Sequence, residues 1–195
     1  MIPQLILAST SPYRKALLER LRLPFEAVSP ETDETPLPGE SPEALSRRLS
    51  EAKARAVAAS RPGAFVIGSD QVAVLDGRSL GKPGTKAKAL AMLKAMAGRE
   101  VLFHTAVTLV APDGSSRTRV DTVRVVMKDM PEADYLAYVE ADDPVDCAGA
   151  AKIESQGVKL VSAVHSDDPT SLVGLPLIAV CEMLEEAGFP LFARP

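Results

Sequence analysis

Residues 4–21 read QLILASTSPYRKALLERL, and this stretch decides the fold. Residues 4–8 form a short, mostly apolar run after a proline, which is typical of a buried strand. Serine and threonine hydroxyls and Pro12 follow, and such residues commonly begin a helix. Leucines at positions 17, 18 and 21 then recur at helical spacing. The chain is therefore predicted to open as a strand, a hydroxyl-rich turn and a helix.

The same alternation continues along the chain around a central hairpin. We expect further strands at residues 25–29, 64–68, 72–75, 78–80, 101–110, 118–126 and 158–164. Further helices are expected at residues 43–59, 85–96, 131–141 and 175–187. Strand–helix units combined with a long hairpin predict an α/β fold with a mixed sheet. The length predicts one domain over residues 1–195, or two small lobes that share one core.

Composition excludes several classes of function. The 22 Lys and Arg residues against 26 Asp and Glu give a net charge of −4, aromatic residues make up 4%, and tryptophan is absent. A nucleic-acid binder needs a basic face, and a single-strand binder also needs stacking aromatics. No apolar run reaches the roughly 20 residues that span a bilayer, and the first residues lack the pattern of a signal peptide. We expect a cytoplasmic enzyme or ligand binder with neither nucleic acid nor membrane as partner.

Common catalytic signatures are missing from the sequence. It contains no Gly-x-Gly-x-x-Gly, Gly-x-Ser-x-Gly or His-Glu-x-x-His motif, and Pro83 occupies the Ser/Thr position of a P-loop. The two histidines, His104 and His165, form no recognisable triad with a serine. The acidic run at residues 165–168 is interpreted as a solvated loop, and the two cysteines are too few for a disulfide framework.

The turn at residues 9–15 carries three hydroxyls and two cations between a strand and a helix. Backbone N–H groups at a helix start, together with Arg14 and Lys15, could hold a polyphosphate. Ordinary helix capping with a solvated basic face explains the same residues equally well. Both interpretations stay open from spacing alone.

Carboxylates and lysines suggest a second part of the same site. Asp70 directly follows the predicted strand 64–68, and open α/β folds bind ligands where strands end. Asp33 and Glu34 lie in an acidic loop, Lys53 in a helix and Lys82 in a Gly/Pro turn. Carboxylates can hold Mg²⁺ or accept a proton from water, and lysines can neutralise phosphates. Taken alone, each of these carboxylates is more often a helix cap or a solvated charge, but the set is typical of metal-assisted phosphoryl or nucleotidyl transfer.

Ordered blocks across the chain resemble the Maf family. The blocks are residues 7–14 (LASTSPYR), 33–35 (DET), 51–54 (EAKA), 68–71 (GSDQ), 81–83 (GKP), 147–149 (CAG) with Lys152 and Glu154, and 168–176 (DPTSLVGLP). The resemblance implies an elongated α/β fold with two lobes around a deep cleft, similar to inosine triphosphate pyrophosphatases. It implies hydrolysis of a nucleoside triphosphate to the monophosphate and pyrophosphate with a divalent metal, Mg or Mn. A homodimer is a further expectation at the level of the family.

Residue roles follow from the same resemblance. Asp70 would accept the proton of the attacking water, and Glu34 with Asp70 would place the metal. The phosphates would be held by Ser9, Arg14, Lys53 and Lys82.

Three positions resemble the branch of the family that hydrolyses 7-methyl-GTP. They are Gln71, the aromatic Tyr13 and Glu154, the last within Lys152-x-Glu154. Members acting on dTTP and UTP usually have Ala-Asp-Thr at residues 69–71. Tyr13 departs from the tryptophan that is common in the 7-methyl-GTP branch, and Ala150-Ala151 departs from its Ser-Phe.

The chemistry of the base agrees with that branch. Methylation at N7 makes guanine cationic, so an aromatic face at Tyr13 and a carboxylate at Glu154 would favour it over plain guanine. Cation–π attraction of about 0.5–2 kcal/mol supplies at most about 30-fold discrimination, so the carboxylate must supply the rest. The alternatives are the dTTP/UTP activity and a non-catalytic nucleotide-binding regulator of cell division.

Overall fold

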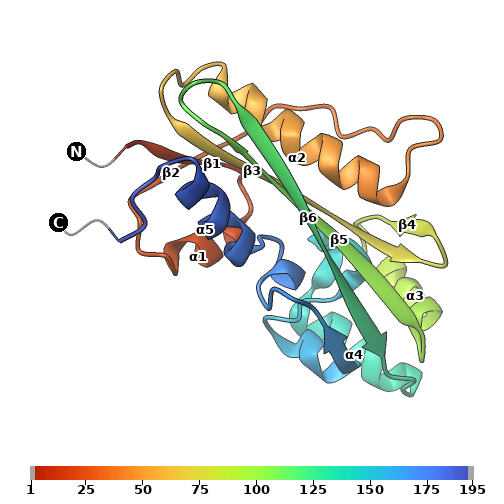
Figure 1. Ribbon diagram of the computed structural model, residues 1–195. Helices are drawn as coiled ribbons and strands as arrows, with labels where there is room; N and C mark the ends of the chain where they lie inside the picture. Colours follow the sequence, from red (N-terminus) through yellow and green to blue (C-terminus); the bar gives the residue numbers. More distant parts are fainter. Residues whose placement is uncertain (1–2, 193–195) are drawn as a thin grey trace.

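The computed structural model describes residues 3–192, in which seven strands form one mixed sheet (Figure 1). The strand order is β2-β1-β3-β5-β6-β7, and β4 pairs with β3. Strands β2, β1 and β3 run parallel, whereas every other pairing is antiparallel. The strands are β1 (Leu5–Ala8), β2 (Glu26–Val28), β3 (Phe65–Leu75), β4 (Arg78–Leu80), β5 (Glu100–Val110), β6 (Ser116–Met127) and β7 (Val161–His165). The predicted α/β fold with a mixed sheet is confirmed.

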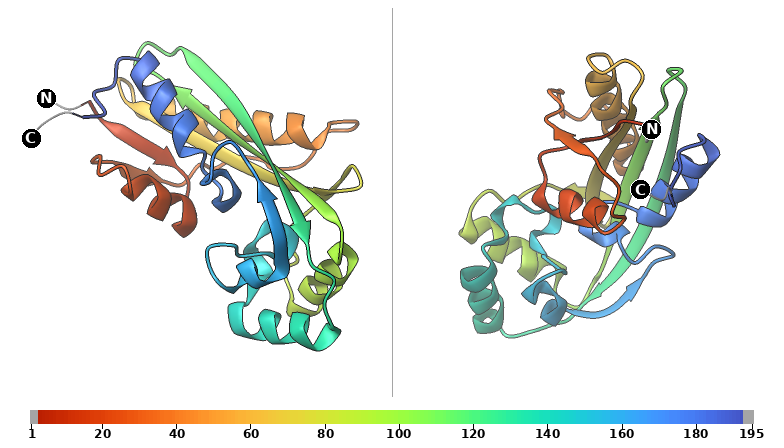
Figure 2. Two further views of the ribbon diagram at one scale, coloured as in Figure 1. Left: turned by 60° about the horizontal axis from the view of Figure 1, so that its bottom comes forward. Right: turned by 90° about the vertical axis from the view of Figure 1, so that its left-hand side faces the viewer.

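Five α-helices cover both faces of this sheet (Figure 2). They are α1 (Pro12–Glu19), α2 (Pro42–Ala58), α3 (Lys86–Met96), α4 (Glu132–Asp142) and α5 (Leu177–Glu186). Strand β1 shows how the faces are divided, because its successive side chains point to opposite sides. Leu7 packs in one apolar cluster with residues of α1 and α5, and Ile6 packs in another with residues of α2. Helices α3 and α4 share a third cluster with the far ends of β5 and β6.

Helix starts follow the capping signals of the sequence. The hydroxyls of Ser11, Ser41 and Thr85 accept hydrogen bonds from the first turns of α1, α2 and α3. The strand expected at residues 158–164 is partly wrong, because Gln156–Leu160 forms a 3₁₀ helix and β7 begins only at Val161. Within residues 3–192, no helix has both the length and the hydrophobicity needed to cross a membrane.

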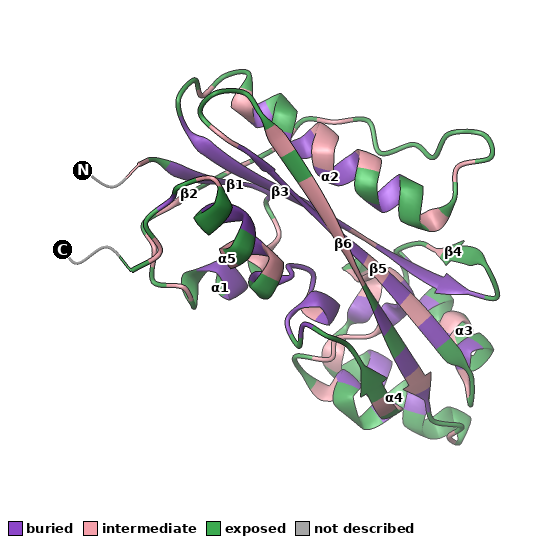
Figure 3. Ribbon diagram, viewed as in Figure 1, coloured by how far each residue is buried: buried purple, intermediate pink, exposed green. Residues whose placement is uncertain are grey.

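Strand β3 is longer than predicted. The expectation that a strand ends at Gly68, before Asp70, is wrong, because β3 continues unbroken to Leu75 and is buried along nearly its whole length (Figure 3). Strand β5 pairs with it from Val66 to Val74 and satisfies its backbone on that side. On the other side β1 pairs only as far as Gly68, and β4 begins to pair at Ala73. Asp70 therefore lies in mid-strand, at a gap between two neighbours on one edge.

Helix α2 lies unusually close to β3 at Gly68. A Cβ atom on this glycine would lie 2.3 Å from the backbone oxygen of Ser50 and 2.6 Å from the backbone nitrogen of Ala54. Only a residue without a side chain permits this approach. The close contact brings Lys53, which lies between these two residues of α2, near the part of β3 that carries Asp70.

Candidate active site

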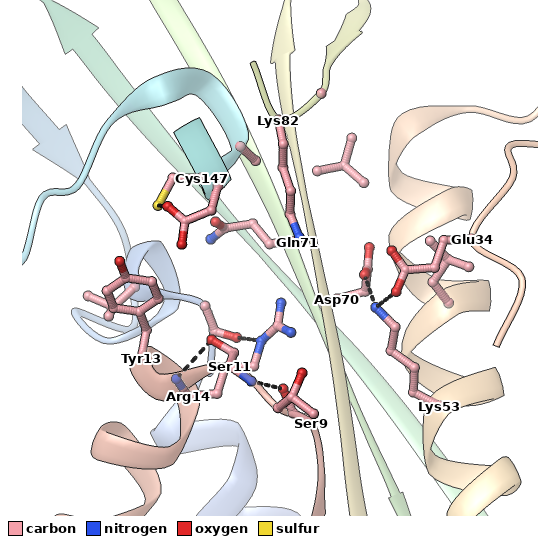
Figure 4. Close-up of a pocket in the computed structure, with 18 of the residues that line it drawn as sticks. Ser9, Ser11, Tyr13, Arg14, Glu34, Lys53, Asp70, Gln71, Lys82 and Cys147 are labelled. Carbon is pink, nitrogen blue, oxygen red and sulfur yellow. Dashed lines mark hydrogen bonds and ion pairs between the residues drawn. The ribbon is translucent and has the colours of Figure 1, made fainter. Parts of the chain in front are cut away.

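The gap along β3 opens into a cavity of about 640 Å³. Residues from distant parts of the chain line it: the turn before α1, the acidic loop at Glu34, α2, β3, the turn after β4, and two segments near residues 146–154 and 172–174. Figure 4 shows the side chains that converge there. The cavity is lined by nine of the residues that the sequence analysis placed in the site, namely Ser9, Tyr13, Arg14, Glu34, Lys53, Asp70, Gln71, Lys82 and Glu154. Lys15 and Asp33, which the sequence also offered, do not line it.

The turn at residues 9–14 caps its helix and also lines the cavity. The Ser9 hydroxyl accepts the N–H of Ser11 at 3.1 Å, and the Ser11 hydroxyl accepts the N–H of Arg14 at 3.4 Å. The Nε of Arg14 donates to the backbone oxygen of Gly174 at 2.8 Å, which orients the guanidinium (Figure 4). Burial lowers the pKa of Arg14, while the charges of Asp70 and Glu34 oppose this shift. Capping and a cation at the cavity are therefore two properties of the same turn.

Lys53 joins two carboxylates at the centre of the site. Its ammonium lies 2.7 Å from Asp70 Oδ1 and 2.7 Å from Glu34 Oε1. The Lys53 and Asp70 side chains are 7% and 9% exposed, whereas that of Glu34 is 54% exposed. A pair buried this deeply is held by charge and hydrogen bonding together, because either partner alone would be an uncompensated buried charge.

The pKa values of the two carboxyl groups are shifted in opposite directions. Burial raises the pKa of Asp70 above its usual value, although Lys53 and Arg14 act against the shift. Burial would also raise the pKa of Glu34, but the hydrogen bond and charge of Lys53, with Lys82 and Arg14, hold it below its usual value. Asp70 is thus the better proton acceptor of the two, and Glu34 keeps its negative charge to lower pH.

Gln71 connects β3 to the segment that follows β7. Its amide nitrogen donates to Thr105 Oγ1 at 2.9 Å and to the backbone oxygens of Ser171 and Leu172 at 3.0 and 3.2 Å. The neighbouring Ser69 hydroxyl donates to the Gly174 oxygen at 2.9 Å, and the same oxygen accepts a hydrogen bond from Arg14 Nε. The role of residues 172–174 in shaping the cavity was not predicted, although they lie in the block 168–176 of the family resemblance. Lys82, in the turn after β4, is exposed and extends into the cavity from the opposite side (Figure 4).

Tyr13 and Glu154 lie at the wall formed by residues 146–154. The Lys152 ammonium lies 5.9 Å from the centroid of the Tyr13 ring, so this ring already takes part in a cation–π contact. Burial raises the pKa of Glu154, as do the nearby Asp142 and Asp146 carboxylates, while Lys152 lowers it. The contact between Lys152 and Tyr13 was missed in the sequence, because it joins residues far apart in the chain.

The two carboxylates at Lys53 fit one kind of metal site. Among residues 3–192, no cluster of three or more His, Cys, Asp and Glu side chains is placed to hold a metal ion. Mg²⁺, however, is often bound by one or two carboxylates together with substrate phosphates and water. Glu34 and Asp70, both within reach of one ammonium, match a site that the substrate completes.

The remaining polar candidates have structural roles. The Asp168 carboxylate accepts the N–H groups of Thr170 and Ile178 at 2.9 and 2.7 Å, so it holds the entry to α5. His104 hydrogen-bonds to Thr122 across the sheet at 2.9 Å. The Asp33 carboxylate accepts the N–H of Thr35. Both cysteines, Cys147 and Cys181, are free and half-buried.

Comparisons with known proteins show which family the chain resembles along most of its length. A family model described as "Maf: Maf-like protein" matches residues 4–187. A protein of Polaromonas sp. named 7-methyl-GTP pyrophosphatase is 53% identical over 97% of this chain and 87% of its own length. One of the same name from Paraburkholderia xenovorans is 55% identical over 97% of this chain and 94% of its own length. A solved dITP/XTP pyrophosphatase of Mycobacterium abscessus aligns over 66% of this chain and 74% of its own, with 24% identity and a TM-score of 0.42.

Proposed function

The chain belongs to the Maf family, and from this premise we propose that it is a nucleoside triphosphate pyrophosphatase that prefers 7-methyl-GTP. It would convert this nucleotide to 7-methyl-GMP and pyrophosphate, as a house-cleaning hydrolase for modified nucleotides. The observation that carries the proposal is the position of Asp70. Its carboxylate has a raised pKa and lies in a cavity lined by Arg14, Lys53 and Lys82.

The cations bind the triphosphate chain and neutralise its charge. Arg14 is oriented by Gly174, and Lys53 is held by two carboxylates, so the positions of both cations at the cavity are set before a substrate binds. Lys82 approaches from the other side of the cavity, and the Ser9 hydroxyl adds a hydrogen-bond donor. A highly charged anion that enters this cavity meets donors from three separate elements. These donors fix the position of the triphosphate relative to β3.

Asp70 deprotonates the attacking water. Its Oδ1 accepts from Lys53 at 2.7 Å, so its orientation is set and the second oxygen remains for the water. The water oxygen forms a bond to the α-phosphorus while the bond from that phosphorus to the α–β bridging oxygen breaks. The leaving pyrophosphate takes the electron pair of that bond, and its added negative charge is stabilised by the lysines.

A divalent metal would be held by Glu34 and Asp70. When bound it would neutralise phosphate charge and act as a Lewis acid. The residues of this chain contribute the remaining parts: Glu34, ionised to low pH, offers a permanent carboxylate, and Lys53 keeps the two carboxylates at a common point.

The base is recognised at the opposite end of the cavity, by Glu154 and Tyr13. The Glu154 carboxylate, which lines the cavity from an exposed position, attracts a cationic purine more strongly than a neutral one. Tyr13 contributes a flat apolar surface, but its ring is shared with Lys152, so its cation–π contribution to the base is reduced. Glu154 therefore carries most of the discrimination for the methylated base, and Gln71 keeps the adjoining segment 171–172 in place.

The test is an assay of the purified protein with 7-methyl-GTP, GTP, dTTP and UTP in the presence of Mg²⁺ or Mn²⁺. Release of pyrophosphate and monophosphate, with the highest kcat/KM for 7-methyl-GTP, is the expected result. Preference for dTTP and UTP would assign the chain to the other activity of the family. Binding without turnover would instead indicate a nucleotide-binding regulator.

A further inference from the structure

The wall that carries Glu154 is an irregular segment fastened to the end of helix α4. Residues 148–150 and 156–160 form 3₁₀ turns, and the chain between them has neither a helix nor a strand to support it. Gly149 and Ala150 both have positive φ angles, +70° and +52°, and an L residue such as Ala150 seldom adopts that conformation. Contacts from outside the segment must therefore hold it in place.

Tyr138 supplies the first of these contacts. Its hydroxyl accepts the backbone N–H of Lys152 at 2.9 Å and donates to the backbone oxygen of Ala150 at 3.3 Å. Burial raises the pKa of Tyr138 to about 12, so the hydroxyl keeps its proton and its role as donor. One side chain thus ties both sides of the bend at residues 150–152.

Asp142, at the last position of the same helix, supplies the second contact. Its carboxylate accepts the Ser155 hydroxyl at 3.0 Å and the backbone N–H of Gln156 at 3.0 Å. Its backbone oxygen accepts the Lys152 ammonium at 3.0 Å. Glu154 lies between these attachment points, so its backbone is held on both sides by α4.

We propose that Tyr138 and Asp142, which do not line the cavity, are positioning residues that set base selectivity by holding Glu154 in place. This inference rests on the proposed function, because it takes Glu154 as the group that reads the base. Loosening the segment gives the Glu154 carboxylate a wider range of positions. The attraction for a cationic base then weakens, while the phosphate end of the cavity is unchanged.

The same helix offers a matched control. Tyr135, one turn earlier, also has a buried hydroxyl with two backbone partners: it donates to Lys128 at 2.8 Å and accepts from Met130 at 3.2 Å. Those partners lie away from the cavity. Tyr138→Phe and Tyr135→Phe therefore remove the same atom and comparable hydrogen bonds, but only the first loosens the wall at Glu154.

The experiment compares kcat/KM for 7-methyl-GTP and GTP in the wild-type protein and the two variants. Tyr138→Phe is expected to lower the ratio of the two values about threefold, less than loss of the Glu154 charge itself, through a higher KM for 7-methyl-GTP with kcat nearly unchanged. Tyr135→Phe should keep the wild-type ratio even if it lowers the melting temperature equally. An unchanged ratio in Tyr138→Phe, or an equal loss in Tyr135→Phe, would overturn the inference.

A second variant keeps the inference testable if Tyr138→Phe does not fold. Asp142→Ala and Asp142→Asn both remove the Asp142 charge, but only Asp142→Ala removes the acceptor for Ser155 and Gln156. The ratio is expected to fall further in Asp142→Ala than in Asp142→Asn; equal ratios in the two variants would overturn the inference. Failure of the proposed function is distinguishable, because the wild-type protein would then show no preference for 7-methyl-GTP at all.

Discussion

The two ends of the cavity are built in different ways. At the phosphate end, Arg14, Lys53 and Asp70 project from regular elements, namely α1, α2 and β3. At the base end, Glu154 and Lys152 project from the irregular segment between two 3₁₀ turns, which is held by hydrogen bonds to α4. In the proposed function, the regular elements hold most of the groups that bind any triphosphate, and the irregular segment holds Glu154, which distinguishes one base from another. Substitutions at the two ends should therefore differ in kind as well as in size.

The largest loss of activity is expected from Asp70→Asn, which removes the proton acceptor and keeps the size and shape of the side chain. We expect kcat to fall about 10³-fold for every nucleotide, within the range observed for a lost general base. The folding stability should change little, because Lys53 keeps Glu34 as a charged partner at 2.7 Å and the amide oxygen can still accept its hydrogen bond. Pyrophosphate release and thermal unfolding measure the two properties. Asp33→Asn, an exposed aspartate outside the cavity, is the control and should keep full activity.

Lys53→Met should give the next largest effect and a shift in pH dependence. Asp70 acts in its ionised form, so activity is lost as pH falls through its pKa. Lys53 lowers that pKa against burial, and its removal should raise it further. The acid limb of kcat/KM should therefore move to higher pH, with about 10²-fold lower activity at neutral pH. An acid limb that stays in place would contradict the coupling; Lys15→Met, on the exposed face of α1, should leave the profile unchanged.

Glu154→Gln should change selectivity and leave general activity intact. The ratio of kcat/KM for 7-methyl-GTP to that for GTP should fall about tenfold, or about 1.4 kcal/mol. In the wild-type protein the ratio should also fall on acidification, over a range above the usual glutamate pKa, because burial raises the pKa of Glu154. The variant should lack this pH dependence. Equal losses of kcat/KM for both nucleotides would show that Glu154 acts on the phosphates and not on the base. Glu140→Gln, at an exposed residue of α4, is the control and should keep the wild-type ratio.

Tyr13→Leu should give the smallest effect. It keeps an apolar surface and removes the ring, so the same ratio should fall only about two- to fivefold, as expected for a cation–π contact that is partly exposed. Steady-state kinetics with 7-methyl-GTP and GTP provide the measurement. If neither Tyr13→Leu nor Glu154→Gln changes the ratio, the base is recognised elsewhere in the cavity.

The phosphate end could largely be predicted from the sequence. The apolar run, hydroxyl turn and amphipathic helix at residues 4–21 mark a strand–turn–helix unit by local patterns alone. The strand break expected before Asp70 was wrong for a physical reason. Three polar residues in a row suggest a strand end, but here Ser69 and Gln71 find hydrogen-bond partners in β5 and in residues 171–174, so the strand continues.

The base end could not be predicted in the same way. Its geometry depends on contacts between segments far apart in the chain, such as Lys152 with the Tyr13 ring and Gln71 with Ser171. Ala150 has a positive φ angle, and its backbone oxygen accepts a hydrogen bond from the hydroxyl of Tyr138, a contact that no local pattern indicates. Family resemblance identified the residues of this wall, but only the structure shows what holds them.

The position of the oxygen from water tests the central claim most directly. Hydrolysis of 7-methyl-GTP in ¹⁸O-labelled water, followed by mass spectrometry of both products, reveals which phosphorus is attacked. Attack on the α-phosphorus by a water that Asp70 deprotonates predicts one ¹⁸O atom in 7-methyl-GMP and none in pyrophosphate, with almost no labelled product from Asp70→Asn. Label in pyrophosphate, or release of orthophosphate in its place, would contradict the account.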